Sequence, residues 1–293
     1  IEIGQIILNQ RIFRSIDNEH EFKDDKTLYQ FSGEYAGKNL ITSEGFKLFY
    51  RTWKPTKGQK LKAVALYVHG LGLHCCRVSG VAKTLAEYGI MVFGYDQVGF
   101  GFSGGRRTYA PRFDNFVNDV NDMVLPLIRQ SQEASKLPLF IIGAQYGALL
   151  ALSVAFRHRF IYLLKGIICI SPLLELHGNK PEPILNKLKH LGALDSVINT
   201  QSPKHLCEEI PGLAEAICDS ADLMAHPMLV FHDPKDNICD YEATKSFVDN
   251  IRSEDKTLVD IKGHGFEMRS NVVERIGEWI SDRSQRAIPE EQS

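Results

Sequence analysis

The sequence predicts an α/β fold with a mostly parallel central sheet and helices on both of its faces. Short apolar runs alternate along the chain with segments whose apolar residues recur at helical spacing, as in strands joined by helical crossovers. The runs are apolar throughout, which is typical of strands covered on both faces of a sheet. Several polar residues come directly after these runs, and parallel sheets bind their ligands beyond the carboxyl ends of the strands.

Composition limits the classes of function. The chain has 293 residues, of which 44% are hydrophobic and 24% are charged, as in an ordinary globular protein. A net charge of -2 argues against a nucleic-acid partner, because binding to phosphates needs a basic face. The six cysteines form no C-x-x-C pair and no spacing suited to metal ligands. We therefore expect no metal site, no cofactor, and free thiols rather than disulfides.

A membrane-spanning segment is not predicted. Leu137–Phe156 is mostly apolar and about as long as a bilayer span, but a proline and two glycines interrupt it where a strand, a turn and a helix would meet. No secretory signal opens the chain, which begins at Ile1 rather than at methionine. We expect an intracellular, cytoplasmic protein and leave import into an organelle open.

The first segment, residues 1–35, is an N-terminal extension that stands apart from the rest. Within residues 1–31, apolar residues form an imperfect helical stripe, and a charged patch follows it. Two interpretations stay open: a helix packed on the main domain, or an arm that docks a protein partner.

The following elements are predicted in order. Alternating residues on either side of Ser43-Glu44-Gly45 indicate a β-hairpin over residues 39–53. Short apolar runs predict strands at Ala63–Val68, Ile90–Tyr95, Leu139–Ile142, Gly166–Ile170, Met228–Phe231 and Thr257–Ile261. Helical periods predict helices at Val81–Tyr88, Phe113–Gln130, Glu242–Ile251 and Val272–Ile280, and a further helix after position 145. We expect Pro126 to kink or shorten the helix that contains it.

These elements divide the rest of the chain into a core, an insertion and a tail. The core comprises residues 36–173 and 226–284, and residues 285–293 form a C-terminal tail. Residues 174–225 interrupt the alternation of strands and helices with polar and helical segments. We interpret them as a small cap inserted over the edge of the sheet.

The stretch from Leu139 to Leu152 predicts the centre of the site. An apolar strand leads into a turn with Gly143 and Gly147, and an Ala/Leu-rich helix follows. This spacing is that of a nucleophile elbow, G-x-S-x-G, in which the central residue takes strained backbone dihedrals. The centre here is Gln145 instead of serine, and an amide has no nucleophilic oxygen for a histidine to activate.

Further motifs occur in order along the chain. They are Ser43 to Leu48, Arg51 to Pro55, His69-Gly70-Leu71-Gly72 with His74, Tyr95 to Gly104, Ile170-Ser171-Pro172-Leu173, Asp236 to Asp240, and Gly263-His264. With these motifs, the chain resembles the monoacylglycerol lipase and lysophospholipase group of α/β-hydrolases. The resemblance runs from about residue 41 to residue 283, and it is weakest in the cap.

The resemblance implies roles for five residues. Leu71 and Tyr146 would supply the two backbone N–H groups of an oxyanion hole. Asp236 and His264 would be the acid and the base of a catalytic triad, and Gln145 stands at the substituted nucleophile position.

The chain departs from the family pattern at other positions near the chemistry. Ala144 stands where the family usually has histidine, Asp233 stands where it usually has glycine, and the loop before His264 is one residue short. This clustering of departures is consistent with relaxed catalytic demand. A ligand under the cap is expected to be hydrophobic or acyl in character.

Three functions remain open from the sequence. The leading hypothesis is a non-hydrolytic relative of monoacylglycerol lipases that serves as a binding or structural component, and therefore an inactive enzyme. The first alternative is a serine-type hydrolase of monoacylglycerol or lysophospholipid esters whose natural residue 145 is serine. The second alternative is a hydrolase or lyase in which Asp236 and His264 alone deprotonate water or a carbon acid. A substitute nucleophile at Cys75 or Cys76 would require a lowered thiol pKa.

Overall fold

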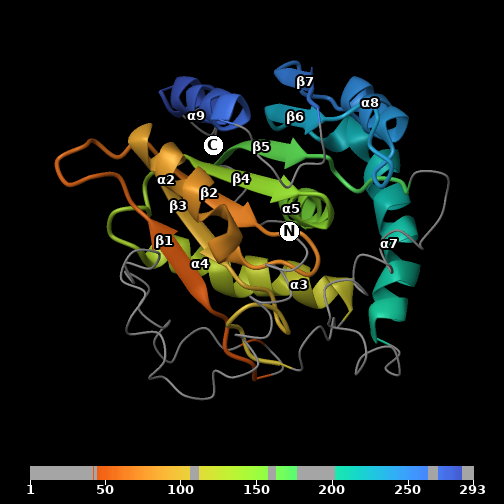
Figure 1. The fold of residues 1–293 in the computed structure, drawn as a ribbon, viewed down its shortest axis with the longest axis horizontal. Coiled ribbons are helices and arrows are strands. Elements are labelled where there is room, and N and C mark those ends of the chain that lie inside the picture. Colours follow the sequence, from red (N-terminus) through yellow and green to blue (C-terminus); the bar gives the residue numbers. More distant parts are fainter. Residues whose placement is uncertain are drawn as a thin grey trace, which may run out of the picture.

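The computed structural model describes residue 42 and residues 45–105, 112–157, 163–176, 202–262 and 270–285. Within these ranges the chain forms a seven-stranded sheet in the order β1-β3-β2-β4-β5-β6-β7 (Figure 1). Strand β1 pairs antiparallel with β3, and the other neighbouring pairs are parallel. The predicted mostly parallel α/β sheet is confirmed. Its strands are β1 (Tyr50–Trp53), β2 (Ala63–Val68), β3 (Ile90–Tyr95), β4 (Leu139–Ala144), β5 (Leu164–Ile170), β6 (Met228–His232) and β7 (Lys256–Asp260).

The strand boundaries follow the apolar runs of the sequence. Strands β2 and β3 coincide with their predicted runs, and every residue of both strands is buried. Strand β5 begins at Leu164 rather than at Gly166, because Leu164 is buried as well. The hairpin expected over residues 39–53 stays a prediction, since residues 39–41 lie outside the described ranges. The described part shows a turn, in which the N–H of Gly45 donates to the carbonyl of Thr42 at 2.8 Å, followed by β1.

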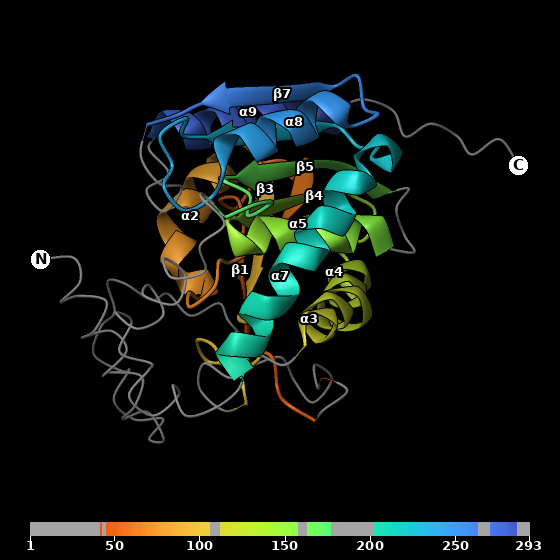
Figure 2. The same ribbon diagram turned by 90° about the vertical axis from the view of Figure 1, so that its right-hand side faces the viewer.

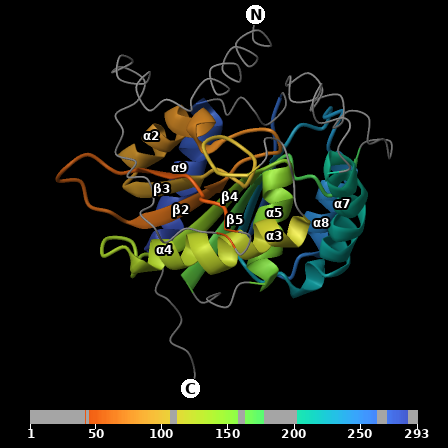
Figure 3. The ribbon, with the colours of Figure 1, turned by 90° about the horizontal axis from the view of Figure 1, so that it is seen from below.

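Helices cover both faces of the sheet, as predicted. On one face α2 (Ser79–Glu87) and α9 (Ser270–Ser284) share a buried cluster with the strands. On the other face lie α3 (Phe113–Asp119), α4 (Leu125–Gln130), α5 (Tyr146–Arg157) and α8 (Tyr241–Asn250). Figure 3 shows α2 and α9 across the strands from α3, α4 and α5.

The helix predicted over residues 113–130 is interrupted close to Pro126. Helix α3 passes into a π-helical segment, η3 (Val120–Val124), and α4 follows with Pro126 in its first turn. In a continuous α-helix the proline ring would clash with the carbonyl of Asp122, four residues earlier. The wider π turn relieves this crowding. The expected effect of Pro126 is therefore present as a widened turn rather than as the end of the helix.

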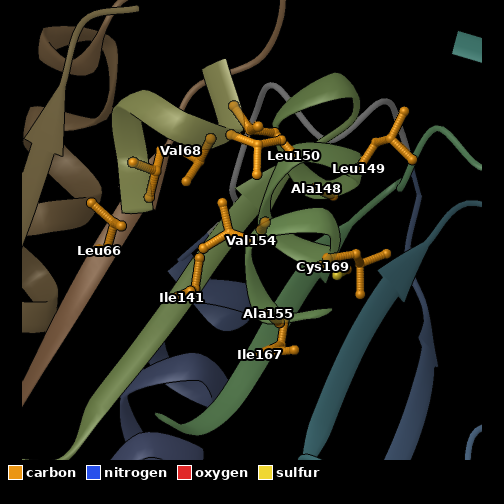
Figure 4. Packing of buried hydrophobic residues seen from close by; sticks show 14 of the residues in the cluster. Leu66, Val68, Ile141, Ala148, Leu149, Leu150, Val154, Ala155, Ile167 and Cys169 are labelled. Carbon is orange, nitrogen blue, oxygen red and sulfur yellow. The ribbon is translucent and has the colours of Figure 1, made fainter. Parts of the chain in front are cut away.

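The centre of the core lies between α5 and the middle strands (Figure 4). Helix α5 is buried on almost every side, from Tyr146 to Ala155. Its side chains pack with those of β2, β4 and β5 in one fully buried cluster, which includes Leu66, Val68, Ile141, Ala148, Leu149, Leu150, Val154, Ala155, Ile167 and Cys169. The turn that precedes α5 is thus anchored to a fully buried part of the core.

Part of the predicted cap is the helix α7 (Ser202–Asp219), which is followed by the short helix η6 (Ala221–Leu223). Helix α7 contacts α3 and α5, and Figure 2 shows it running across α5. Residues 177–201, the arm at residues 1–31 and the tail after residue 285 lie outside the described ranges, so the domain boundaries stay a prediction. Among the described residues, no helix has the length and apolar character needed to cross a membrane.

Candidate functional site

The turn between β4 and α5 places Gln145 at a strained corner of the backbone. Its φ angle is 52°, in the left-handed region that residues other than glycine rarely adopt. The N–H of Gln145 donates to the carbonyl of Ile170 at 2.8 Å, and its carbonyl accepts from the N–H of Ala148 at 2.9 Å. The neighbouring strand and the first turn of α5 therefore fix the corner from both sides. The strand, turn and helix expected around Gln145 are all present.

Gly143 and Gly147 permit this turn because no larger residue fits at either position. A Cβ atom on Gly147 would stand 2.3 Å from the carbonyl oxygen of Val68. A Cβ atom on Gly143 would stand 2.4 Å from the carbonyl oxygen of Gly147. The two glycines thus allow α5 to approach the end of β2, which brings the turn against the loop after that strand.

The side chain of Gln145 lies against the loop that follows β2. The residue is 7% exposed, and its Oε1 atom is 4.0 Å from the position that a Cβ atom on Gly70 would occupy. The side chain is therefore directed toward the loop that holds Leu71. His264 lies outside the described residues.

His69 holds the loop after β2 in its conformation. The N–H of Gln97 donates to His69 Nε2 at 3.0 Å, and the Gln97 Nε2 amide donates to the His69 carbonyl at 2.8 Å. His69 Nδ1 is 2.9 Å from the carbonyl of Gly70, so Nδ1 carries the proton and donates. Burial lowers the pKa of His69 to about 3, which keeps the ring neutral at pH 7. Leu71, the expected first oxyanion donor, follows in this loop and is half-buried.

Tyr146, the expected second oxyanion donor, is the first residue of α5. Its ring packs edge-on against Phe113 and Phe116, with centroid separations of 5.7 Å and 6.3 Å. Burial raises the pKa of the Tyr146 hydroxyl well above its usual value, so the side chain is no acid or base near pH 7. Its backbone N–H lies in the first turn of the helix, where N–H groups have no intrahelical acceptor.

Asp236 lies in the turn after β6, and the backbone fixes its carboxylate. Oδ1 accepts from the N–H groups of Ile238 at 2.8 Å and Cys239 at 3.1 Å. The N–H of Asp236 donates to the carbonyl of Asp233 at 2.9 Å. The backbone of this turn therefore fixes the orientation of the Asp236 carboxylate through Oδ1, independently of the group that faces Oδ2.

His232 is a neighbour of Asp236 that the sequence pattern did not reveal. Its Nε2 atom is 3.8 Å from Asp236 Oδ2 and 3.2 Å from the carbonyl oxygen of Cys239. Burial lowers the pKa of His232, so the ring is neutral at pH 7 and the contact is not an ion pair. The only signal in the sequence was a spacing of four residues at the end of a strand, which is too common to indicate a pair.

The segment at residues 171–176 connects the turn at Gln145 with the turn after β6. The N–H of Leu173 donates to the carbonyl of Gln145 at 3.3 Å. The N–H of Asp240 donates to the carbonyl of Glu175 at 2.9 Å. The loops after β4, β5 and β6 are thus in contact at one edge of the sheet, which places Gln145 and Asp236 at the same edge, as predicted from their order in the chain.

Two predictions about this site stay untested. His264 lies outside the described residues, so its pairing with Asp236 remains a prediction. The expected lack of a metal site also remains a prediction for the whole chain; in its described part, no cluster of histidine, cysteine, aspartate or glutamate side chains is suited to a metal ion.

An apolar cavity of about 520 Å³ opens between α7, α8 and residues 173–176. Its size is that of a small-molecule site. It adjoins Leu173, which is bonded to Gln145, but Gln145 does not line it. Its lining residues come from three distant parts of the sequence and were not predicted individually. They include Leu174, Glu175, Leu176, Ile210, Ala214, Glu215, Cys218, Ala243, Ser246, Phe247 and Asn250.

Comparison with known proteins places these features in context. A family model described as "Serine aminopeptidase, S33" (Hydrolase_4) matches residues 59–202, which include β2 to β5 and the turn at Gln145. Monoglyceride lipase of Mus musculus is 27% identical over 280 residues, covering 84% of this chain and 90% of that protein. Monoglyceride lipase of Homo sapiens is 26% identical over 284 residues, covering 85% of this chain and 91% of that protein.

The fold has a counterpart in a solved structure. The crystal structure of Paleococcus ferrophilus monoacylglycerol lipase aligns with a TM-score of 0.63 and 19% sequence identity. The alignment covers 81% of this chain and 99% of that chain. The likeness extends over almost the whole of that structure, so the sheet and its helices are shared as a unit.

Proposed function

Because the chain is an α/β-hydrolase similar to monoacylglycerol lipases, we propose that it binds a neutral acyl ligand without hydrolysing it. The observation that carries the proposal is Gln145 at the strained corner, with φ of 52°. Acyl transfer at such a corner needs an oxygen or sulfur nucleophile, and a glutamine amide supplies neither. Loss of the nucleophile from a triad lowers turnover by about 10⁶-fold.

The position of the Gln145 side chain also supports the proposed lack of hydrolysis. In an acyl-transfer site, the reacting carbonyl lies about 3 Å from both the nucleophile and the oxyanion donors. Here the Oε1 atom of Gln145 is directed toward Gly70, at the start of the loop that holds Leu71. The amide therefore takes up space that a tetrahedral intermediate would need.

The cavity between α7 and α8 supports an acyl ligand. Its walls carry aliphatic and aromatic side chains, among them Ile210 and Phe247, which suit a hydrocarbon chain. Glu175 and Glu215 also line it, and their negative charges disfavour a fatty-acid carboxylate. A neutral head group, such as the glycerol of a monoacylglycerol, meets no such repulsion. The relatives named as monoglyceride lipases make this the first ligand to test.

The experiment measures binding and turnover on the same protein. We expect 1-oleoylglycerol to bind in isothermal titration calorimetry, and oleate to bind at least tenfold more weakly. Ala214→Phe fills the cavity and should weaken binding of 1-oleoylglycerol tenfold or more. Ala216→Phe makes the same change on the exposed side of α7 and should leave the dissociation constant unchanged.

Turnover decides the other half of the proposal. We expect the native protein to release oleate from 1-oleoylglycerol no faster than a heat-denatured control. Release well above that rate, abolished by His264→Ala, would contradict the loss of catalysis. Equal binding to the Ala214→Phe and Ala216→Phe variants would contradict the assignment of the cavity.

A further inference from the structure

Two adjacent cysteines, Cys75 and Cys76, follow the loop after β2. They begin the short helix η2 (Cys75–Val78). Cys75 is fully buried, whereas Cys76 is half-buried and within reach of small reagents. The Nη1 atom of Arg51, on the edge strand β1, is 3.6 Å from Cys76 Sγ. Arg51 is only 5% exposed, so its charge acts on the sulfur through little water.

The neighbouring groups also act on Cys76. The Cys75 thiol and the His74 ring favour the thiolate and lower the pKa of Cys76, although burial and the charge of Asp96 act in the opposite sense. Burial raises the pKa of Cys75, so Cys75 keeps its proton and acts as a donor. The N–H of Cys75 donates to Asp96 Oδ1 at 2.7 Å, which fixes the start of η2.

Cys218 provides the contrast within the same molecule. It is also half-buried, but its charged neighbours are Asp219 and Glu175, and burial together with these carboxylates raises its pKa to about 11. Two thiols of comparable exposure thus differ in their surroundings: Cys76 has Arg51 and His74 as neighbours besides the carboxylate of Asp96, whereas the charged neighbours of Cys218 are carboxylates. Cys169 and Cys239 are free thiols that are fully buried.

From the cluster of Arg51, His74, Cys75 and Cys76, we propose that Cys76 is a reactive thiol that hydroperoxides oxidise. The Cys76 thiolate attacks one oxygen of the peroxide, the O–O bond breaks, and hydroxide or alkoxide leaves and takes a proton from water. The product is a sulfenic acid on Cys76, and the peroxide is reduced to water or alcohol.

Alkylation at limiting reagent tests the thiolate directly. An unperturbed thiol has a pKa of about 8.5, so less than 1% is thiolate at pH 6. We expect iodoacetamide at pH 6 to modify Cys76 at least tenfold faster than Cys218, as measured by peptide mass spectrometry. The fragment ion that contains only Cys76 and Arg77 separates the Cys76 adduct from a Cys75 adduct. Equal rates at Cys76 and Cys218 would overturn the proposal.

Variants assign the effect to the cluster. Arg51→Met should lower the rate of Cys76 alkylation at pH 6 by fivefold or more. Lys54→Met removes the same charge from the exposed end of the strand, where Lys54 pairs with Glu133, and should leave the rate unchanged. Because Arg51 is buried, Arg51→Lys serves as a second variant, which keeps the charge and should retain most of the rate. The pH profile reports the combined influence of Arg51, His74, Cys75 and Asp96, the charged and titratable groups that face the sulfur.

Oxidation with dilute hydrogen peroxide completes the test. A dimedone adduct on Cys76 supports the proposal. Oxidation that appears first at Cys218, or that is unchanged in Arg51→Met, contradicts it. Neither readout depends on esterase activity or on lipid binding, so this proposal stands or falls independently of the proposed function.

Discussion

Gln97 donates two hydrogen bonds to His69, one from its backbone N–H to His69 Nε2 and one from its side-chain amide to the His69 carbonyl. This arrangement requires an unprotonated Nε2. Protonation of His69 would break the first bond and would place a charge in a fully buried position. The loop after β2 is therefore built around a neutral histidine.

Acid should consequently weaken the fold through His69. The unfolded histidine binds a proton below about pH 6.5, whereas the pKa of folded His69 is about 3. The contribution of His69 to stability is thus complete above pH 6.5 and is lost as the pH falls toward 3, by at most about 1.4 kcal/mol per pH unit. Urea unfolding of His69→Gln at pH 7, 6 and 5 should show a shallower decline than that of the unsubstituted chain.

Two other groups set the background for that comparison. Burial lowers the pKa of His232, so this residue also reduces the stability of the fold as the pH falls. Burial raises the pKa of Asp96, so that carboxyl group has the opposite effect on stability. Both remain in His69→Gln, so the difference between the two proteins isolates His69. Identical slopes would show that His69 is protonated in the folded state at mild acid.

Gln145→Ser should not restore the rates of an active monoacylglycerol lipase. The serine would occupy the strained corner, but Asp233 and the shortened loop before His264 alter the surroundings of the predicted acid and base. A displacement of about 1 Å in such a site costs about 10²-fold in rate. The measurement is hydrolysis of monoacylglycerol beside an active relative. Rates equal to those of the relative would mean that residue 145 is the only defect.

Gly147→Ala should destabilise the protein by several kcal/mol. The new Cβ atom would stand 2.3 Å from the carbonyl oxygen of Val68, and relief of that overlap would require α5 to move within a densely packed core. Gly212→Ala in α7 is the matched control, because nothing lies within 4 Å of its added Cβ atom. It should stabilise α7 by about 0.5–1 kcal/mol. A melting temperature that falls equally in both variants would contradict this account of the turn.

Asp236→Asn should be tolerated better than Asp236→Ala. Asparagine keeps an oxygen that accepts from the N–H groups of Ile238 and Cys239, whereas alanine leaves both donors unbonded at a buried site. An unsatisfied buried donor costs about 1–3 kcal/mol. Urea unfolding should therefore rank the unsubstituted chain first, Asp236→Asn second and Asp236→Ala last. If the two variants were equally stable, the turn would not depend on that oxygen.

The sheet was predictable because its signals are local. The strands at Ala63–Val68 and Ile90–Tyr95 are continuous apolar runs, and their ends coincide with the ends of those runs. The turn at Gln145 was predictable because Gly143 and Gly147 are required on either side of it: a Cβ atom at either position would overlap a neighbouring backbone carbonyl. The π-helical segment before Pro126 was foreseen only as an interruption, since its form depends on how the helix packs.

Contacts between distant segments were less accessible to sequence reasoning. The pairing of His232 with Asp236 depends on how the chain turns after β6, and no periodicity encodes that turn. The cavity between α7 and α8 is formed by parts of the chain that meet only after folding. Cys76 was recognised as a candidate nucleophile, but its neighbour Arg51 comes from an edge strand 25 residues earlier in the chain.

The left-handed corner at Gln145 also bears on how the gene can change. A glutamine codon reaches a serine codon by two base changes at the least, and each of those routes passes through either a proline codon or a stop codon. Proline fixes φ near −65°, which is incompatible with a φ of 52° at this position. Both shortest paths from glutamine to serine therefore cross an intermediate that cannot form the turn or cannot complete the chain. With glutamine at this corner, single substitutions give little access to a serine nucleophile.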